Sequence, residues 1–589
     1  MPALRATIAA NVRCPEVTAA AATLLEALVG AGEGAGLPSA AADAVIAEVR
    51  QCLHANTRIG LVDEEELVAR SGLVGAVLAL LRLHRVGTLD SHLAQLVLPL
   101  LSVVSRWAWD QALRAALGEE GACELLFDLL AQFCMRDEVL EVALGSLHAL
   151  AWNQHNKERM AQAPRESGLK LVVRALERFP RNEKIQTEGI GVISIMSYYS
   201  DPNKALLHEC GALEALVLAM DKNAQAGQLQ QQACLAIWSL AAATQKLPDV
   251  SPSTPSIRQA QAVAKGKVAP AKSPARPVVK APVPAEEEAA EQRRAALARA
   301  GAIEALLAAL HAHEADALLC ERAARALVVM SYESKARSRA VYGGLETLAR
   351  ALRVHAKHAH VLVQVAAAFK NVSGALLKDG EDQKKDLTAG LLPCTTALVE
   401  TLRRHVSNGD LLKQALPAIG NVAQNMHANA RLPVGVIEVM LDGMSHLRLD
   451  REVQARGMIS LHNLAMMPKG APDSGPAARA LSKSGIGTFG LRLFHQVVSV
   501  LELHGSDHRL ILLALKVLEK FADAASASAA AKFLAPPGLP PVTTRFSQRV
   551  ARNRQRVAQQ EASEWGEGHG DIVGKWSSLV KKGVVKDSK

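Results

Sequence analysis

The sequence has few aromatic residues: Phe, Trp and Tyr make up 3% of the 589 residues, although hydrophobic residues reach 49%. The apolar content is therefore mostly alanine, leucine and valine. This composition suits closely packed helices and is poor for β-structure, in which aromatic and β-branched side chains predominate. A single core rarely extends over so long a chain, so several domains or an array of repeats is expected.

Long apolar runs and paired cysteines are also missing. No uninterrupted apolar run reaches the length of about 18 residues that a membrane-spanning helix needs. The first residues, Met1 to Ile8, lack the apolar core of a signal peptide. The eight cysteines occur without a CxxC or CxH pair, as expected for free thiols in a reducing compartment. We therefore expect a cytoplasmic protein without a membrane span, with a nuclear or ciliary location as the alternative.

Catalytic signatures are a third absence. The sequence contains no GxxxxGK[ST], GxSxG or HExxH. The segment Gly485 to Gly490 matches GxGxxG, but no strand-like run precedes it, so it is interpreted as a turn before a helix. His355, His358 and His360 cluster without a nearby Cys or carboxylate in the pattern of a metal site. We expect no enzyme, no cofactor and no metal.

The net charge of +9 is unevenly placed. Residues 246–285 hold seven Lys or Arg and one Asp, together with several Ser-Pro and Thr-Pro pairs, and residues 541–589 are also basic. Such segments cannot build a core, so we predict a disordered basic, Pro-rich loop at 246–285 and a flexible basic tail with a short helix at 526–589. The loop is interpreted either as an inert insertion or as a site of phosphorylation.

Internal repetition is the strongest positive signal. Glycine followed by an apolar helix recurs at intervals of about 43 to 47 residues, the period of helical repeat arrays. In each unit a polar turn, a second apolar helix and a short polar helix follow, with apolar residues spaced three and four apart. The clearest starts are Gly121, Gly168, Gly211, Gly301 and Gly344.

The third helix of several units ends in a motif that resembles the armadillo family. It reads Asn371-Val-Ser, Asn421-Val-Ala and Asn463-Leu-Ala, with degenerate versions upstream. The resemblance covers roughly residues 72 to 525. It implies an all-α fold, a right-handed α-solenoid of armadillo-type (ARM/HEAT-like) repeats, whose third helices line a concave groove that binds proteins.

The repeat pattern divides the chain into successive parts. Armadillo-like repeats are predicted at 72–245 and at 286–525, the second stretch ending in a C-terminal cap. Residues 1–71 are predicted to form an N-terminal helical cap or a degenerate repeat, because terminal units differ from internal ones. The basic loop at 246–285 is predicted to interrupt one repeat rather than to separate two domains.

The resemblance places a ladder of carboxamides in the groove. Asn371, Asn421 and Asn463 each offer one acceptor and two donors, which suits the backbone of an extended peptide. Seven residues earlier, on the same helix face, stand polar side chains, and three residues after the equivalent positions of upstream units stand aromatic ones. These further groove candidates are Gln364, Gln414 and Arg456, and Trp152, Tyr198 and Tyr332.

The predicted function is therefore that of a non-catalytic adaptor or scaffold that binds a protein or an extended peptide. An importin-like transport receptor is a second hypothesis. It is disfavoured because the positions four residues before each ladder Asn, where the import receptors carry Trp, hold Ala367, Pro417 and Ile459. A structural component of a cytoskeletal or ciliary assembly is a third.

The basic tail is a second candidate contact. Arg545, Arg549, Arg552 and Arg556 are spaced four, three and four apart and would share one face of a helix. Such a stripe suits an acidic or cytoskeletal partner. Nucleic acid is disfavoured, because no aromatic residues are interleaved with the arginines to stack on bases.

Overall fold

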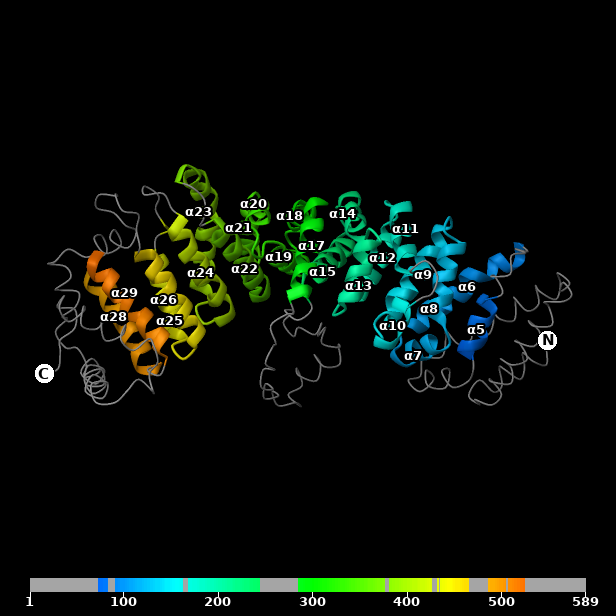
Figure 1. Ribbon diagram of the computed structural model, residues 1–589, viewed down its shortest axis with the longest axis horizontal. Helices are drawn as coiled ribbons and strands as arrows, with labels where there is room; N and C mark the ends of the chain where they lie inside the picture. The colour runs from blue at the N-terminus through cyan, green and yellow to red at the C-terminus, as the bar shows by residue number, and fades with distance from the viewer. Residues whose placement is uncertain are drawn as a thin grey trace. The chain divides into compact units, whose positions relative to one another are not determined.

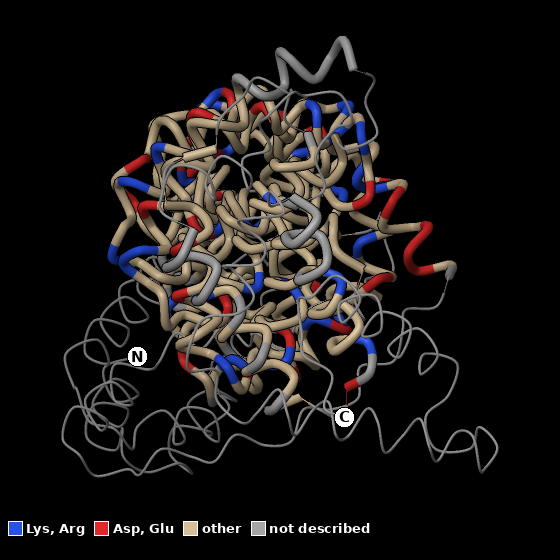
Figure 2. Tube along the Cα trace, turned by 90° about the vertical axis from the view of Figure 1, so that its left-hand side faces the viewer, with Lys and Arg blue, Asp and Glu red and all other residues tan. Residues whose placement is uncertain are grey.

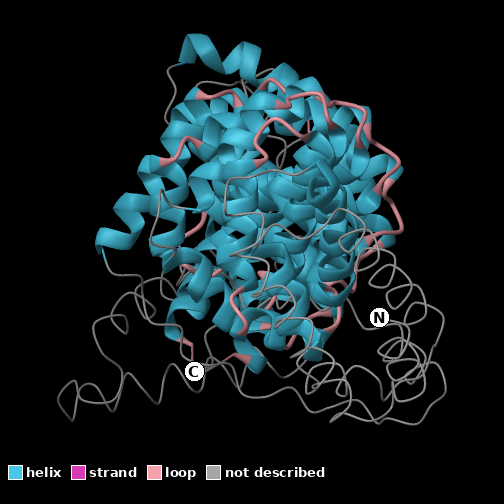
Figure 3. Ribbon diagram, turned by 90° about the vertical axis from the view of Figure 1, so that its right-hand side faces the viewer, coloured by secondary structure: helices cyan, strands magenta, loops and turns pink. Residues whose placement is uncertain are grey.

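The computed structural model describes residues 73–82, 91–162, 168–243, 284–376, 381–425, 432–433, 435–465, 486–504 and 507–524. Within these ranges every regular element is a helix and none is a strand (Figure 3). The chain divides into two compact units, Met1–Ala305 and Leu306–Lys589, and the division falls inside helix α18. The predicted cap at 1–71, the loop at 246–285 apart from its last two residues, and the tail at 526–589 lie outside the described residues.

The first unit consists of helices that follow one another in sets of three (Figure 1). The third helices α6, α9, α12 and α15 pack on one another in sequence order, and the second helices α8, α11 and α14 form a parallel row beside them. Its helices are α5 (Leu73–Arg82), α6 (Ser91–Ala108), α7 (Gln111–Glu119), α8 (Ala122–Gln132), α9 (Asp137–Leu150), α10 (Gln154–Gln162), α11 (Gly168–Arg178), α12 (Glu183–Ser197), α13 (Asp201–Glu209), α14 (Ala212–Lys222), α15 (Gly227–Ala241), α17 (Pro284–Arg299) and the start of α18 (Ala302–Ala312).

The second unit repeats the same two rows. The third helices α19, α22, α24, α26 and α29 pack in sequence order, and α21, α23, α25 and α28 form the second row. Together with the end of α18, its helices are α19 (Ala317–Met330), α20 (Lys335–Tyr342), α21 (Leu345–Val354), α22 (Ala359–Ala375), α23 (Glu381–Arg404), α24 (Gly409–Asn425), α25 (Val436–His446), α26 (Arg451–Ala465), α28 (Ile486–Leu503) and α29 (His508–Ala524). The predicted all-α solenoid is confirmed.

Five of the described third helices, α12, α19, α24, α26 and α29, begin at a side-chain cap. Asn182 accepts hydrogen bonds from the backbone amides of residues 184 and 185, and Asp316 and Asp450 do the same two and three residues on. A side-chain oxygen at this position satisfies amides that have no partner inside the helix. The recurring Asn or Asp therefore fixes where the third helices start in both units.

A buried glutamine then ties the third helix to the second. Gln186 donates to the carbonyls of Leu176 and Phe179 at 2.7 and 3.0 Å, which lie at the end of α11. Gln230 and Gln454 occupy the same place, in the first turn of α15 and α26, and each bonds two carbonyls of the preceding helix end. All three glutamines are almost fully buried. We call this contact the glutamine latch.

Several repeats start with a glycine in the left-handed region. Gly121, Gly211 and Gly301 have φ between 80° and 90°, which residues with a Cβ adopt only at a cost. Gly344, in contrast, has φ −102°, and Gly168 lies inside α11. The sharp turn before the second helix therefore requires glycine in some repeats only.

The short first helices supply buried side chains that cap the carboxyl ends of the third helices. On α10, Asn156 donates to Leu150 O at the end of α9, while Lys157 donates to Tyr198 O at the end of α12. On α13, Asn203 bonds Met196 O, and Lys204 bonds Ala242 O at 2.8 Å. Each first helix thus links two successive third helices.

The same arrangement holds on both sides of the 244–283 segment. Arg293 and Arg294 of α17 donate to the carbonyls of Leu240 and Ala241, at the end of α15, at 2.7 and 3.2 Å. In the second unit, Arg337 of α20 bonds Met330 O at 2.6 Å. Cations stabilise the carboxyl end of a helix, where the unpaired carbonyls carry partial negative charge.

Two of these cations are lysines whose burial is costly. Lys204 is fully buried, and Lys157 is 7% exposed. Burial lowers the pKa of both amines to about 8, and for Lys204 the nearby Asp201 carboxylate opposes that shift. Because of this burial, the two amines lose their protons at a mildly alkaline pH, below the range of an exposed lysine.

Candidate functional site

The polar residues assigned to a groove lie on α22, α24 and α26, which pack one after another in the second unit (Figure 1). On each helix the two positions seven residues apart are half-buried, and the residue that follows each of them is buried. They therefore border the solvent on one face of the third-helix row. We call this set the polar strip: Gln364, Asn371, Gln414, Asn421, Arg456 and Asn463.

The sequence predicted that the ladder carboxamides bind a peptide, but the side-chain donors of two of them already bond the preceding third helix. Asn371 donates through Nδ2 to Val328 O at 2.9 Å and to Ser331 Oγ at 3.3 Å, both at the end of α19. Asn421 donates in the same way to Lys370 O and Ser373 Oγ on α22. Both donors of each amide are thus used between repeats, because the Asn lies at the seam between successive third helices.

Two cations are held by neighbours along the strip: its member Arg456, and Lys370, which precedes Asn371 on α22. Lys370 donates to Gln414 Oε1 at 2.7 Å, and Arg456 bonds Glu452 at 2.6 Å and the carbonyl of Lys413. Burial lowers the pKa of Lys370, and the positive charge of Arg456 lowers it further. Two positive charges are therefore held on either side of α24, on the third helices that precede and follow it. Sequence reasoning missed Lys370, although it directly precedes Asn371.

The strip also has an apolar element. Ile459, between Arg456 and Asn463 on α26, is 47% exposed, and Pro417 of α24 is half-buried. Ala367 is buried. These are the positions at which the import receptors carry tryptophan, so the face presents small and aliphatic side chains instead.

The three predicted aromatic groove residues are divided between the two units, so they do not form one site with the polar strip. Trp152 follows α9 in the first unit and is 51% exposed. Tyr198 ends α12, is half-buried, and contacts the rings of Tyr199 and Trp238 at 4.2 and 6.1 Å between centroids. Tyr332 follows α19 in the second unit and is half-buried.

Other residues around Trp152 and Tyr198 escaped sequence reasoning. Trp109, after α6, is 53% exposed and packs edge-on against His148 at 5.7 Å. His148 Nδ1 lies 2.8 Å from Glu188 Oε2 on the next third helix. Gly191 permits this, since a Cβ there would stand 2.5 Å from the imidazole. The sequence signal was available: an aromatic residue recurs one to two residues after the third helix.

Charge distinguishes the third helices of the two units. Lys and Arg are interspersed with Asp and Glu over the described chain as a whole (Figure 2). On α9, α12 and α15, however, five carboxylates accompany a single lysine, whereas α19, α22, α24 and α26 carry six Lys or Arg and three carboxylates. The two third-helix faces therefore suit partners of different charge.

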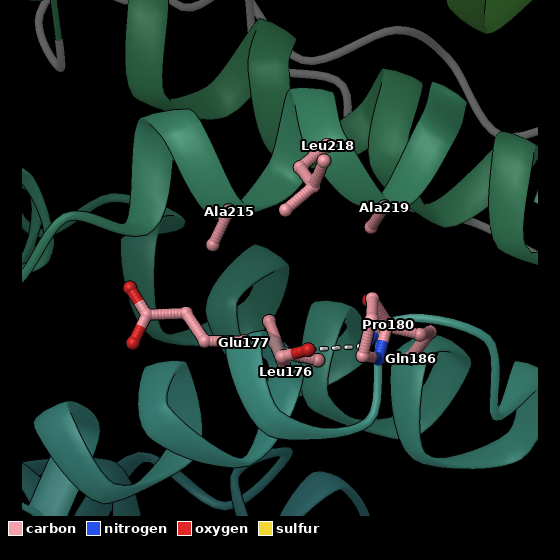
Figure 4. A pocket seen from close by; sticks show the side chains of 7 residues that line it. All are labelled: Leu176, Glu177, Pro180, Gln186, Ala215, Leu218 and Ala219. Carbon is pink, nitrogen blue, oxygen red and sulfur yellow. Dashed lines mark hydrogen bonds between the residues drawn. The ribbon is translucent and has the colours of Figure 1, made fainter. Parts of the chain in front are cut away.

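A small hollow lies between α11 and α14 in the first unit (Figure 4). Its empty volume is about 160 Å³, including open solvent, and Gln186 bonds Leu176 O at its wall. Apolar side chains dominate the lining, so the hollow is a packing seam between second helices rather than a polar ligand site. It is lined by Leu176, Glu177, Pro180, Gln186, Ala215, Leu218 and Ala219.

Metal-ligating clusters and membrane-spanning helices are two further kinds of feature. Within the described residues, no group of three or more His, Cys, Asp or Glu side chains is placed to hold a metal ion. No single described helix is long and apolar enough to cross a membrane, although the bent pair Ala285–Arg299 and Ala302–Ala312 has a suitable length and composition. The tail arginines, Arg545, Arg549, Arg552 and Arg556, lie outside the described residues.

One solved structure is similar enough in its coordinates to support the fold. No protein-family model matches the chain, and no curated protein does. The crystal structure of an engineered protein matches at 18% identity and a TM-score of 0.52, over 84% of this chain and 98% of its own. A structure from work on a phosphorylation switch that controls the interaction between cadherin and beta-catenin matches at 16% identity and a TM-score of 0.41, over 99% of both chains. The chain is a helical repeat protein.

Proposed function

We propose that the chain is a non-catalytic protein-interaction scaffold of the armadillo type, and that the polar strip of its second unit binds an extended segment of a partner protein. The observation that carries the proposal is a pair of half-buried cations, Lys370 of α22 and Arg456 of α26, which bond α24 from either side. The exposed Ile459 lies on α26 with Arg456. Partly desolvated charges that are already oriented form stronger contacts with a ligand than freely moving ones.

The chemistry favours an acidic partner segment. The Asn371 and Asn421 donors are used between repeats, so recognition depends on the two cations and on the remaining carboxamides. Gln364 and Asn463 make no hydrogen bond within the described part of the chain, and each has donors and an acceptor for a peptide backbone. Carboxylates of the partner would pair with Lys370 and Arg456.

The test compares captured partners. The full chain and the double variant Lys370→Ala/Arg456→Ala are used as bait in extracts of the native cell. We expect at least one captured protein to bind the variant about tenfold more weakly, because loss of a charge pair costs more than about 1.4 kcal/mol. Arg404→Ala, which removes an exposed cation from α23, is the matched control.

Circular dichroism and urea unfolding establish that the double variant is folded. If every captured protein binds the wild type, the double variant and the control equally well, the polar strip is not the binding site.

A further inference from the structure

The scarce aromatic residues gather in one place. Four of the six tryptophans and two of the four tyrosines lie in the last turn, or directly after the end, of the third helices of the first unit. Those helices, α6, α9, α12 and α15, pack consecutively, so their carboxyl ends lie side by side. We call this set the aromatic row: Trp107, Trp109, Trp152, Tyr198, Tyr199 and Trp238.

Three side chains of the row are open to solvent. Trp109 is 53% exposed, Trp152 is 51% exposed and Tyr199 is 42% exposed. Tyr199 also has φ 55°, a conformation that a bulky residue adopts only under strain. Exposed aromatic side chains that cluster on a rigid scaffold are typical of docking surfaces.

The base of the row is rigid. The cations of the first helices bond the carbonyls beneath it, including those of Trp109, Tyr198 and Ala242. Trp109 packs against His148, which is paired with Glu188. The rings are therefore held in place before any ligand arrives, which reduces the entropy lost on binding.

One segment of the chain starts where the row ends. Residues 244–283 leave the first unit just after α15, whose last turn carries Trp238, and rejoin it at Pro284 of α17, which packs against α15. This segment contains seven prolines and seven Lys or Arg against one Asp.

The spacing of the row suits such a segment. Axes of packed helices lie about 8–10 Å apart, and proline-rich chains repeat every three residues, a rise of about 9 Å. Residues three apart, such as Pro274 and Pro277, would therefore meet aromatic side chains of successive repeats. Trp238 is 3% exposed, so the exposed rings lie on α6, α9 and α12, which span about 20 Å. About seven residues cover that distance, so the 40 residues suffice to follow the row and return.

We propose that the aromatic row is the docking surface of the chain's own proline-rich, basic segment, residues 244–283. The segment then acts as a tethered ligand, and a partner that carries the same chemistry must compete with it. This inference concerns the first unit and stands apart from the proposed function of the polar strip, so either can fail alone.

The test uses a labelled peptide of residues 265–283 and two forms of the chain. One is the full chain, and the other has residues 246–283 replaced by a short Gly-Ser linker. Fluorescence anisotropy should show binding to the linker form and about tenfold weaker binding to the full chain, because a tethered ligand competes at an effective concentration in the mM range. Equal binding to both forms, or binding to neither, would overturn the proposal.

Variants of the row identify the surface. In the linker form, Trp109→Ala/Trp152→Ala should weaken the peptide about tenfold or more, since exposed aromatic anchors dominate such contacts. Leu218→Ala, which trims a similarly exposed side chain on α14, is the matched control. A peptide with its prolines replaced by alanine should also bind weakly. Unchanged affinity of the double Trp variant would place the segment elsewhere.

A measurement on the full chain tests docking in place. Trypsin should cleave between Lys265 and Lys280 several-fold faster in Trp109→Ala/Trp152→Ala than in the wild type or in Leu218→Ala, because undocking opens the segment to the protease. Identical cleavage rates in all three chains would contradict the proposal even if the free peptide binds.

Discussion

The third-helix faces of the two units share a framework and differ in chemistry. In the first unit the exits of α6, α9, α12 and α15 carry aromatic rings, and α9 and α12 carry mostly carboxylates. In the second unit the corresponding helices carry carboxamides and cations, among them Lys370 and Arg456. One chain therefore presents two surfaces that suit different ligands.

The comparison separates the buried residues that maintain the repeat in both units from the outward residues that differ between them. The glutamine latch occurs in both units, at Gln186 and Gln230 and again at Gln454. The first helices also cap the third in both units. Because these buried contacts fix the helix positions, the outward positions are free to vary from one repeat to the next.

The largest expected effect tests the shared framework. Gln230→Leu and Gln454→Leu should each lower the free energy of unfolding by about 2–3 kcal/mol, because each leaves two buried carbonyls without a donor. Urea unfolding followed by circular dichroism measures the loss. Gln228→Leu, at an exposed position of α15, should change stability little. A loss in one unit only would show that the latch is not a common device.

A smaller effect tests the carboxamide ladder of the second unit. Asn371→Ala and Asn421→Ala together should lower the free energy of unfolding by about 2 kcal/mol, since each removes hydrogen bonds between repeats. Asn463→Ala should cost little, because the Asn463 side chain makes no hydrogen bond in the described residues. If all three Asn→Ala substitutions lowered the free energy of unfolding equally, hydrogen bonds between repeats would not explain the effect.

The smallest effect separates the two units by pH. Between pH 8 and about 10.5, unfolded lysines hold a proton that buried Lys157 and Lys204, with pKa values of about 8, have released. The unfolded state then binds more protons, so this contribution to stability rises with pH. Relative to Lys157→Met/Lys204→Met, the wild type should gain about 1 kcal/mol between pH 8 and about 8.5.

The second unit supplies the control for that titration. Its equivalent cap is Arg337, an arginine in place of a lysine. The stability difference between the wild type and Arg337→Met should therefore not change with pH. A wild-type difference from the double lysine variant that is constant between pH 8 and 10 would contradict the buried-lysine account.

Much of the fold could be predicted because it depends on local patterns. The spacing of Gly121, Gly211 and Gly301 and the apolar periodicity between them determine the order of the helices. The latch could not be predicted by the same reasoning. Gln186 and Gln230 appear polar in sequence, and only the packing of two helices places their amides on carbonyls ten residues away.

The candidate site was less predictable, for a physical reason. Periodicity placed Gln414 and Asn421 on the same helix face, and both are half-buried. It could not reveal that the Asn421 donors bond α22 rather than solvent, because that depends on the distance between neighbouring helices. Spacing also found Trp152 and Tyr198, but the rest of the aromatic row was missed, because its members are dispersed along the sequence and gather only when successive helix ends align.

The caps contributed by α17 join it to α15 by hydrogen bonds as well as through the peptide chain. Arg293 and Arg294 bond the end of α15 across more than 40 intervening residues, so hydrogen bonds hold these helices together independently of the peptide chain between them. The order of the repeats in space therefore does not require the chain to run from α15 to α17. A circular permutant whose new termini fall within residues 244–283 would retain every cap described for the first unit.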